Sequence, residues 1–159
     1  MKKINIRKAN INDLEKVSKV VLEAFVSEIN GNIKELEDKA VTNQAKFFNY
    51  YREMNLSNIP NIIYIAELDN KIIGVAGGNI HKHHWGDSIW GSEDFWFVKK
   101  EYRGSKAGLL LFNKLIEWFK NNGAERIQMT HYTWNPKVED FYRAKGFKPF
   151  EINYVYKVK

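Results

Sequence analysis

Apolar and polar residues alternate at the start of the chain, and the spacing between apolar residues then lengthens. Residues Ile4–Arg7 alternate at every second position, which predicts a short strand. From there to Asn30-Gly31 the apolar residues recur every three or four positions, which predicts a helix capped by Asn10 or Asn12. The expected apolar face of this helix comprises Leu14, Val17, Val21, Leu22 and Phe25.

The helical spacing resumes once and then gives way to strands. A second helical stretch is expected from about Ile33 to Leu56, interrupted near its middle by a β-branched pair that weakens a helix. The runs Ile62–Leu68 and Ile72–Ile80 flank Asp69-Asn70 and predict a hairpin. Inside the returning run, Gly77-Gly78 predicts a bulge or the close approach of another group.

The second half of the chain alternates strands and helices. After an irregular stretch from His81 to Gly91, the aromatic run Trp90–Val98 predicts a strand. The leucine-rich run Leu109–Phe119 predicts an amphipathic helix that ends at Asn121-Asn122-Gly123. Three shorter elements are expected after it, namely a strand at Arg126–Tyr132, a helix at Pro136–Ala144 and a strand at Ile152–Val158.

The element order β-α-α-β-β-β-α-β-α-β predicts an α/β fold with one sheet and helices on both of its sides. With 159 residues, 44% apolar and 28% charged, we expect one domain spanning residues 1–159. No apolar run approaches the roughly 20 residues of a membrane span, and the first residues lack a secretory apolar stretch. The chain has no cysteine, so we expect a cytoplasmic protein without disulfides or thiolate metal sites.

Charge is distributed unevenly along the chain, whose net charge is +6. Up to and including Val98 there are 12 Lys/Arg against 13 Asp/Glu, and after it 13 against 6. The second portion should therefore attract an anionic ligand, whereas the first should not repel a cationic one. A solvated basic surface without a partner is the alternative.

A glycine-bearing turn leads from the Trp90–Val98 strand directly into the next helix. Free N–H groups and the positive end of the dipole at a helix start favour an anion, and small residues let a phosphate approach the backbone. The spacing fits neither a P-loop, which ends in Gly-Lys-Ser/Thr, nor a dinucleotide fingerprint, which needs a third glycine. The turn consists of Arg103, Gly104, Ser105, Lys106, Ala107 and Gly108.

A second motif follows about thirty residues later, with Asn135 before the short helix, Tyr142 on it and Gly146-Phe147 at its end. With both motifs, the sequence resembles the GNAT superfamily of acyl-CoA-dependent N-acyltransferases. The resemblance covers essentially the whole chain. The segments Tyr102–Asn113 and Gly146–Glu151 are most similar to GNAT-like proteins often met in phage genomes.

The resemblance implies a single-domain GNAT fold, with a mixed, mostly antiparallel sheet flanked by helices on both faces, and acetyl-CoA as cosubstrate. The loop Arg103–Gly108 would hold the coenzyme pyrophosphate through its main-chain amides. Phe97 and Val98 would pair with the pantetheine arm like an added strand, and Asn135 would contact the same arm. The family usually has glycine where this chain has Lys106, so that side chain would either crowd the loop or contact a phosphate.

Acyl transfer also needs groups that move protons. By resemblance, Tyr142 would protonate the departing thiolate, and the reference pKa of about 10 for a phenol is close to about 8.5 for a thiol. Several family members place a glutamate on the strand that carries Glu93 and Asp94 here. Because side chains alternate along a strand, only one of the two faces the cleft, and both stay open as the base. A free main-chain amide near Phe97 would stabilise the developing oxyanion.

By resemblance, the acceptor site lies near the first two helices, bordered by Phe25, Glu28 and Tyr51. We expect a small-molecule or peptide amine as acceptor, no metal, no nucleic-acid or membrane partner, and a monomer or homodimer. The run His81–His84 invites a metal interpretation, but zinc takes three or four ligands and no cysteine is available, so an exposed loop is favoured.

Two functions of other classes stay open. The chain could be a catalytically silent protein that keeps the fold to bind acyl-CoA or to serve a structural or interaction role. It could also be a basic nucleic-acid binder, for which Tyr132, Trp134 and Arg143 would supply aromatic and cationic contacts.

Overall fold

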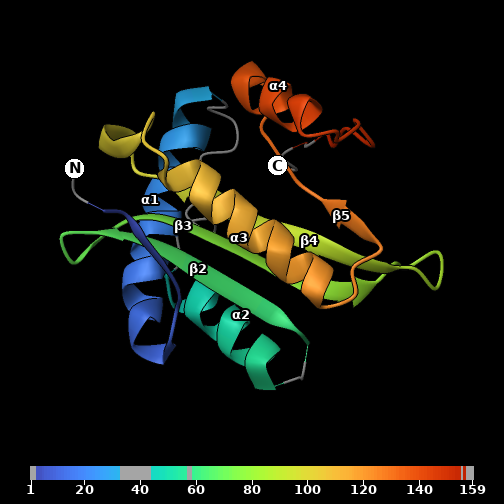
Figure 1. Ribbon diagram of the computed structural model, residues 1–159, viewed down its shortest axis with the longest axis horizontal. Coiled ribbons are helices and arrows are strands. Elements are labelled where there is room, and N and C mark those ends of the chain that lie inside the picture. The colour runs from blue at the N-terminus through green and yellow to red at the C-terminus, as the bar shows by residue number, and fades with distance from the viewer. Residues whose placement is uncertain (1–2, 33–43, 57–58, 155, 157–159) are drawn as a thin grey trace.

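The computed structural model describes residues 3–32, 44–56, 59–154 and 156. A five-stranded mixed sheet lies between two layers of helices, as the sequence predicts (Figure 1). The strand order follows the chain, and the first four strands pair antiparallel while the last pair is parallel. The strands are β1 (Asn5–Lys8), β2 (Asn61–Leu68), β3 (Lys71–Lys82), β4 (Ile89–Val98) and β5 (Arg126–Gln128).

Helices α1 (Leu14–Asn32) and α2 (Gln44–Leu56) cover one face of the sheet. Alternate side chains of the strands point toward them, because successive strand residues face opposite sides. The buried cluster on this face comprises Leu14, Val17, Val20, Val21, Tyr51, Ile63, Ile65, Val75 and Phe95. The expected second helical stretch is therefore present from Gln44 onward, whereas its first part lies outside the described residues.

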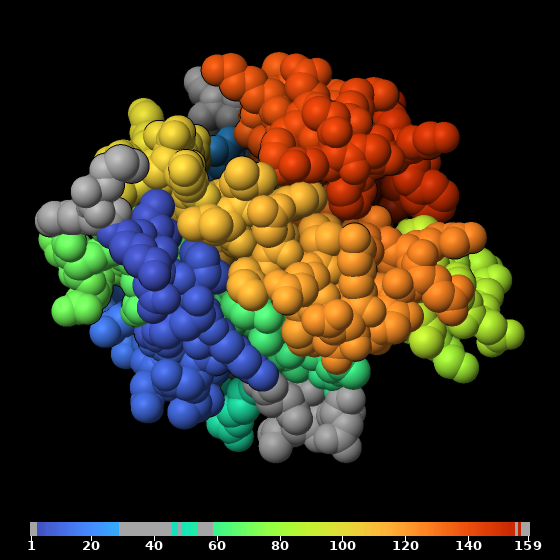
Figure 2. Space-filling view, viewed as in Figure 1, coloured from blue at the N-terminus to red at the C-terminus, as the bar shows by residue number. Residues whose placement is uncertain are grey.

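Helix α3 (Ala107–Asn121) covers the opposite face, and α4 (Pro136–Ala144) lies beside it (Figure 2). The core here comprises Ile62, Ala66, Ile73, Ala76, Ile80, Ala107, Leu111, Leu115 and Phe119. Both Gly78 and Gly91 lie under the Phe119 ring, where an added Cβ would come within 2.6 and 2.5 Å of it. The close approach that the glycine pair predicted is thus confirmed at Gly78.

The hairpin between β2 and β3 turns at Asp69 and Asn70, whose φ angles of 51° and 61° are those of a two-residue hairpin turn. Between β1 and α1, the 3-10 helix η1 (Ile11–Asp13) is capped by the Asn10 side chain. Arg7 ties these parts together, because its guanidinium bonds Asp13 at 2.7 and 2.8 Å and Glu67 at 3.0 and 2.8 Å. The hairpin and an Asn10 cap confirm the sequence predictions.

Several predicted boundaries are wrong. Strand β3 continues to Lys82 and β4 begins at Ile89, so the irregular stretch is shorter than expected. Strand β5 ends at Gln128 and not at Tyr132, because the Glu93 side chain accepts the Thr130 N–H in place of a neighbouring strand. The first helix runs on to Asn32, past the expected stop at Asn30-Gly31.

The expected last strand is also wrong within the residues that the structure describes. Phe147 docks on Tyr142 with ring centroids 5.6 Å apart, and Phe150 contacts Trp90 at 5.6 Å. Beyond Phe150 no main-chain hydrogen bond joins residues 151–154 to the described sheet, and Ile152 and Tyr154 are 66% and 91% exposed. Residues 152–154 therefore pair with no strand of the described sheet, and most of the rest of the expected strand lies outside the described residues.

Candidate active site

Strands β4 and β5 pair over only three residues and then separate. Trp90, Gly91 and Ser92 lie opposite Arg126, Ile127 and Gln128, and the pairing ends there. The rest of β4, residues 93–98, keeps β3 as its neighbour on one side only. The residues that the sequence singled out as catalytic lie at this point of separation.

A bulge in β4 includes one of the two acidic residues. Gly78 pairs with Glu93 and Gly77 with Phe95, which makes Asp94 the extra residue of the bulge that Gly77-Gly78 predicted. Glu93 reaches toward the segment after β5, whereas Asp94 reaches Tyr51 on α2. The two carboxylates therefore lie on opposite sides of the sheet, as side-chain alternation predicts.

Glu93 sits where the two strands part. One of its carboxylate oxygens accepts the Thr130 N–H at 2.9 Å, and no cationic side chain among the described residues bonds it. Burial raises the pKa of Glu93 to about 7; the Thr130 hydrogen bond opposes this rise, and the charge of Asp94 adds to it. A carboxyl group that titrates near neutral pH can both take up and release a proton under ordinary conditions.

Tyr142 reaches the same place from α4. Its ring is only 5% exposed and packs between Trp96 and Phe147. The hydroxyl donates to the Thr130 carbonyl at 3.2 Å. Burial, and then the charge of Glu93, raise the pKa of Tyr142 well above its usual value, so the phenol is protonated at neutral pH.

The free edge of β4 offers main-chain N–H groups. Lys99 donates to the Ile73 carbonyl at 2.9 Å, whereas the Val98 carbonyl accepts from Arg103 Nε at 3.2 Å and so points away from β3. The main-chain groups of successive residues in an antiparallel strand point in alternate directions. The N–H groups of Val98 and Trp96 therefore point outward, and that of Phe97, between them, points toward β3.

The loop before α3 leaves several main-chain donors without an acceptor. Ser105 donates to the Tyr102 carbonyl at 3.2 Å, and Ala107 to Ser105 Oγ at 3.3 Å. Within the described part of the chain, the N–H groups of Gly104, Lys106, Gly108 and Leu109 have no such partner. Gly104 has a φ of +85°, which requires glycine, whereas Lys106 has an ordinary helical conformation and an exposed side chain. This cluster of donors at a helix start is suited to an anion.

Arg103 joins the loop to α1. Its Nη2 donates to Glu28 at 3.1 Å, while Nε bonds the Val98 carbonyl. The other oxygen of Glu28 lies 3.5 Å from the indole nitrogen of Trp134, in the segment before α4. The resemblance implied that Glu28 borders the acceptor site. In the structure it contacts Arg103 of the loop expected to hold the coenzyme.

Aromatic rings fill the space between α1, β4 and the segment before α4. Phe25 contacts Phe97 and Tyr132 edge to face, at 5.8 and 6.3 Å. Tyr132 stacks on Trp134 at 4.7 Å with the rings nearly parallel. The structure therefore brings Phe25 and Phe97 together. Tyr51 belongs to the core on the same face of the sheet, but it is only 2% exposed and its hydroxyl donates to Asp94.

Asn135 is the residue immediately before α4, and its N–H donates to the Tyr132 carbonyl at 2.9 Å. Its side chain makes no capping hydrogen bond to the helix.

Thr130 is the residue that sequence reasoning missed, because a threonine that acts through its main chain leaves no chemical signal in a sequence. Trp134 carried a signal, since an indole next to the Asn135-Pro136 motif stands out, but it suggested nucleic acid.

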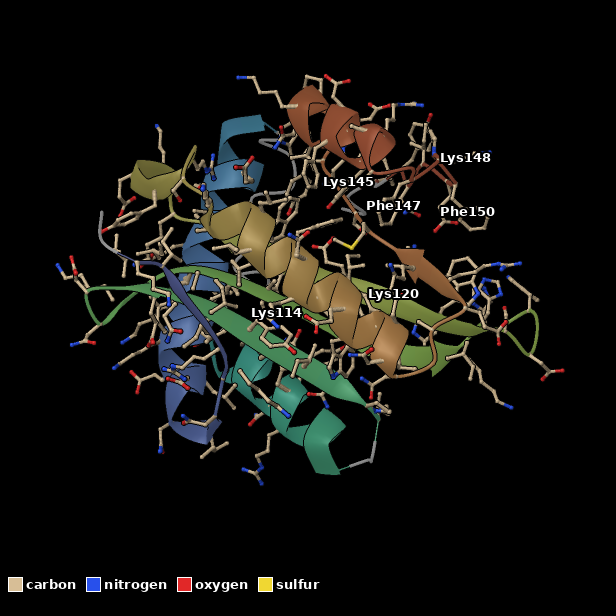
Figure 3. All side chains as sticks on the ribbon, viewed as in Figure 1. Lys114, Lys120, Lys145, Phe147, Lys148 and Phe150 are labelled. Carbon is tan, nitrogen blue, oxygen red and sulfur yellow. The ribbon has the colours of Figure 1, made fainter. Side chains whose placement is uncertain are left out.

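Four basic residues of the second half, Lys99, Lys100, Arg103 and Lys106, lie between β4 and α3, and others lie on α3 and on or near α4. Figure 3 shows Lys114 and Lys120 on α3, and Lys145 and Lys148 near the end of α4. Lys114 pairs with Glu117 at 2.9 Å, and the Lys145 ammonium lies 5.6 Å from the centre of the Phe141 ring. The positive charge of this half is therefore spread over the α3–α4 side of the sheet.

The histidine run belongs partly to β3, which includes His81 and Lys82. The His83 ring stacks on Trp90 at 4.4 Å and on His84 at 4.7 Å. Among the residues described, no three His, Asp or Glu side chains are grouped as a metal ion would require. None of the described helices has the length and apolar character to cross a membrane.

Comparison with known proteins finds one matching family and one curated relative with a similar description. The model of a family described as Acetyltransferase (GNAT) family matches residues 28–147. YobR of Bacillus subtilis (strain 168), described as an uncharacterized N-acetyltransferase, is 37% identical over 62 residues, which are 39% of this chain. The match covers only 25% of the length of that relative.

Solved structures resemble the fold over nearly its full length. A transcriptional regulator from Bacillus halodurans C-125 superposes with a TM-score of 0.74 at 20% identity, covering 98% of this chain and 100% of that one. A predicted acetyltransferase from Clostridium acetobutylicum, solved with acetyl-CoA, gives 0.72 at 18% identity, covering 95% and 96%. At these identities the likeness is one of fold.

Proposed function

Because the chain belongs to the acetyltransferase (GNAT) family, we propose that it transfers an acetyl group from acetyl-CoA to a primary amine by direct attack, with both substrates bound together. One observation carries this proposal. Glu93 and Tyr142, a base and an acid, are bonded to the same residue, Thr130, at the point where β4 and β5 separate. With no cysteine in the chain, no acyl-cysteine intermediate is invoked.

The residues present fit the coenzyme. Acetyl-CoA supplies an activated thioester and a pyrophosphate, and the free amides at Gly104, Lys106 and Gly108 suit the latter. Arg103 has five N–H donors, of which the Val98 carbonyl and Glu28 use two, so others remain for a phosphate oxygen. The outward N–H groups of Trp96 and Val98 would bind the pantetheine arm. In the Clostridium acetobutylicum neighbour, acetyl-CoA accompanies the same fold.

Glu93 would activate the amine. An alkylamine with a pKa near 10.4 is neutral in only about one molecule in 2,500 at pH 7, so the site must remove a proton. A carboxylate with a pKa of about 7 accepts that proton, directly or through water, more readily than an ordinary glutamate does. One of the outward N–H groups of β4 would stabilise charge on the carbonyl oxygen, an effect worth about 3 kcal/mol per donor.

Tyr142 would then give its proton to the sulfur as the carbon–sulfur bond breaks. The negative charge of Glu93 is one cause of the raised Tyr142 pKa. When Glu93 takes the amine proton it becomes neutral, which lowers the Tyr142 pKa at the step that needs an acid. Glu93 would release its proton to solvent and Tyr142 would regain one, so the residues return to their starting state.

An assay of thiol release from acetyl-CoA across a panel of amines tests this function. We expect release that depends on the amine and yields one acetylated amine per thiol. Tight coenzyme binding without release for any amine would instead identify a catalytically silent member of the family.

A further inference from the structure

Arg103, the first residue of the loop before α3, already has an anion as its partner. Its Nη2 donates to Glu28 Oε1 at 3.1 Å, and its Nε donates to the Val98 carbonyl at 3.2 Å. Glu28 lies near the end of α1, and this bond joins that end of the helix to the start of α3 (Figure 1). A carboxylate of the protein is therefore bonded to the arginine that stands next to the free amides of Gly104 and Lys106.

The two members of this ion pair are held differently. The Glu28 side chain is 17% exposed, and its second oxygen lies 3.5 Å from the indole nitrogen of Trp134. The Arg103 side chain is 47% exposed and gives Glu28 only one of its five N–H donors. Glu28 is therefore the more firmly held member of the pair, and Arg103 is the one that can turn toward another anion.

The pair is also weak enough to be exchanged. An ion pair between partly exposed side chains stabilises a protein little, because water screens the charges and both side chains lose freedom. Arg7, by contrast, is bonded to Asp13 and Glu67 by four hydrogen bonds of 2.7 to 3.0 Å. A guanidinium can bind a phosphate group through two parallel charge-assisted hydrogen bonds. A diphosphate at the loop, with more negative charge than one carboxylate, would therefore compete with Glu28 for Arg103.

We propose that Glu28 and the coenzyme pyrophosphate exchange Arg103 between them, so that Glu28 weakens coenzyme binding and promotes coenzyme release. This inference rests on the proposed function, which places the pyrophosphate on the Arg103–Gly108 loop. As the coenzyme binds, Arg103 turns from Glu28 to a phosphate oxygen. As CoA leaves, Glu28 takes Arg103 back, which stabilises the coenzyme-free protein. Glu28 acts on the coenzyme through Arg103, so it is a positioning residue.

The test is calorimetric titration of CoA into the unmodified protein and into Glu28→Gln, whose side chain keeps its shape and loses its charge. We expect CoA to bind the variant at least fourfold more tightly, whereas the loss of a merely structural ion pair would not strengthen binding. In an Arg103→Gln background, Glu28→Gln should change the dissociation constant by less than twofold, because the competition needs the arginine. Glu15→Gln, which removes a carboxylate paired with Lys19 near the other end of α1, is the matched control and should leave CoA binding within 1.5-fold.

Pantetheine, the coenzyme arm without the pyrophosphate, should bind the unmodified protein and Glu28→Gln equally within 1.5-fold. If Glu28→Gln does not fold, a crystal structure of the unmodified protein with CoA serves, in which Arg103 should contact a phosphate oxygen and lie more than about 4 Å from Glu28. Equal or weaker CoA binding by Glu28→Gln, the same gain in the Arg103→Gln background, or an Arg103–Glu28 bond that persists beside bound CoA overturns this inference alone. The absence of CoA binding to the unmodified protein overturns the proposed function.

Discussion

Glu93 and Tyr142 hydrogen-bond the two main-chain groups of a single residue, Thr130: Glu93 accepts its N–H at 2.9 Å and Tyr142 donates to its carbonyl at 3.2 Å. A strand and a helix far apart in the chain thereby place the proposed base and the proposed acid on either side of one residue. The charge of the base also raises the pKa of the acid, so their protonation states are coupled. The predictions on catalysis follow from this relationship.

Tyr142→Phe should lower kcat by at least tenfold and leave the dissociation constant of acetyl-CoA within twofold. The reason is that the phenylalanine ring keeps the packing against Trp96 and Phe147 but has no proton for the leaving sulfur. Steady-state thiol release and calorimetric titration of acetyl-CoA measure the two quantities. An unchanged kcat would remove Tyr142 from the mechanism.

Glu93→Gln should abolish the pH dependence of kcat/KM centred on about pH 7. Below that pH Glu93 is protonated and cannot accept the amine proton, so activity should rise with pH through about 7 in the unmodified protein. The variant keeps only the dependence that comes from the amine itself. A pH–rate profile in which the variant retains the inflection would assign it to another group.

The same variant should be more stable than the unmodified protein at high pH. Burial raises the folded pKa of Glu93 from an ordinary 4.5 to about 7, so the folded protein binds more protons than the unfolded chain between these values. Stability is therefore lost as pH rises through that window. Glu93→Gln should increase the free energy of unfolding by up to about 3 kcal/mol at pH 8, and by almost nothing at pH 4. Urea denaturation at the two pH values measures this, and equal effects at both would contradict it.

Gly108→Ala should weaken acetyl-CoA binding at least tenfold without affecting folding. An added Cβ at Gly108 would lie 3.6 Å from Trp96 and Val98, which is ordinary contact, and it would add bulk to one of the residues whose N–H is free at the start of α3. Charge reversal at Arg103 and Lys106 should weaken binding as well. Gly86→Ala, at a position with open space around it, is the matched control. Calorimetric dissociation constants that do not change in Gly108→Ala or the charge-reversal variant would place the pyrophosphate elsewhere.

Asp13→Asn should lower the free energy of unfolding by about 2 kcal/mol at pH 7 and by almost nothing at pH 2. The Arg7 guanidinium holds the pKa of Asp13 at about 2, below its ordinary 3.8. Its contribution is complete above about pH 4 and is lost as pH falls through 2. Glu15→Gln, at an exposed side chain of the next turn, should leave the denaturation midpoint unchanged. An equal shift for both variants would contradict a specific role for Asp13.

Much of the fold could be predicted because local signals and packing agree. The hairpin at Asp69-Asn70, the strand up to Val98 and the leucine-rich helix after Gly108 each combine a turn signal with a clear apolar period. The segment after Phe150 has an equally clear period, but a strand also needs a partner edge, and period alone does not supply one. The narrower similarity to phage proteins stays a prediction.

The site was only partly predictable for a different reason. The glycine-bearing turn before the leucine-rich helix predicted an anion site at Arg103–Gly108, and the resemblance to the family implied the role of Tyr142. Alternation predicted that Glu93 and Asp94 face opposite sides of the sheet, but which of them faces Thr130 and Tyr142 depends on how β4 pairs in the fold, which residue types alone do not reveal. The contact of Glu28 with Arg103 joins residues 75 positions apart, and no local pattern records it.

The most direct measurement for the whole account is a crystal structure of the protein with acetyl-CoA. The account predicts pyrophosphate oxygens within about 3 Å of the amides of the Arg103–Gly108 loop, and the Tyr142 hydroxyl within about 3.5 Å of the sulfur. A coenzyme bound away from that loop, or a sulfur on the far side of β4 from Tyr142, would contradict it.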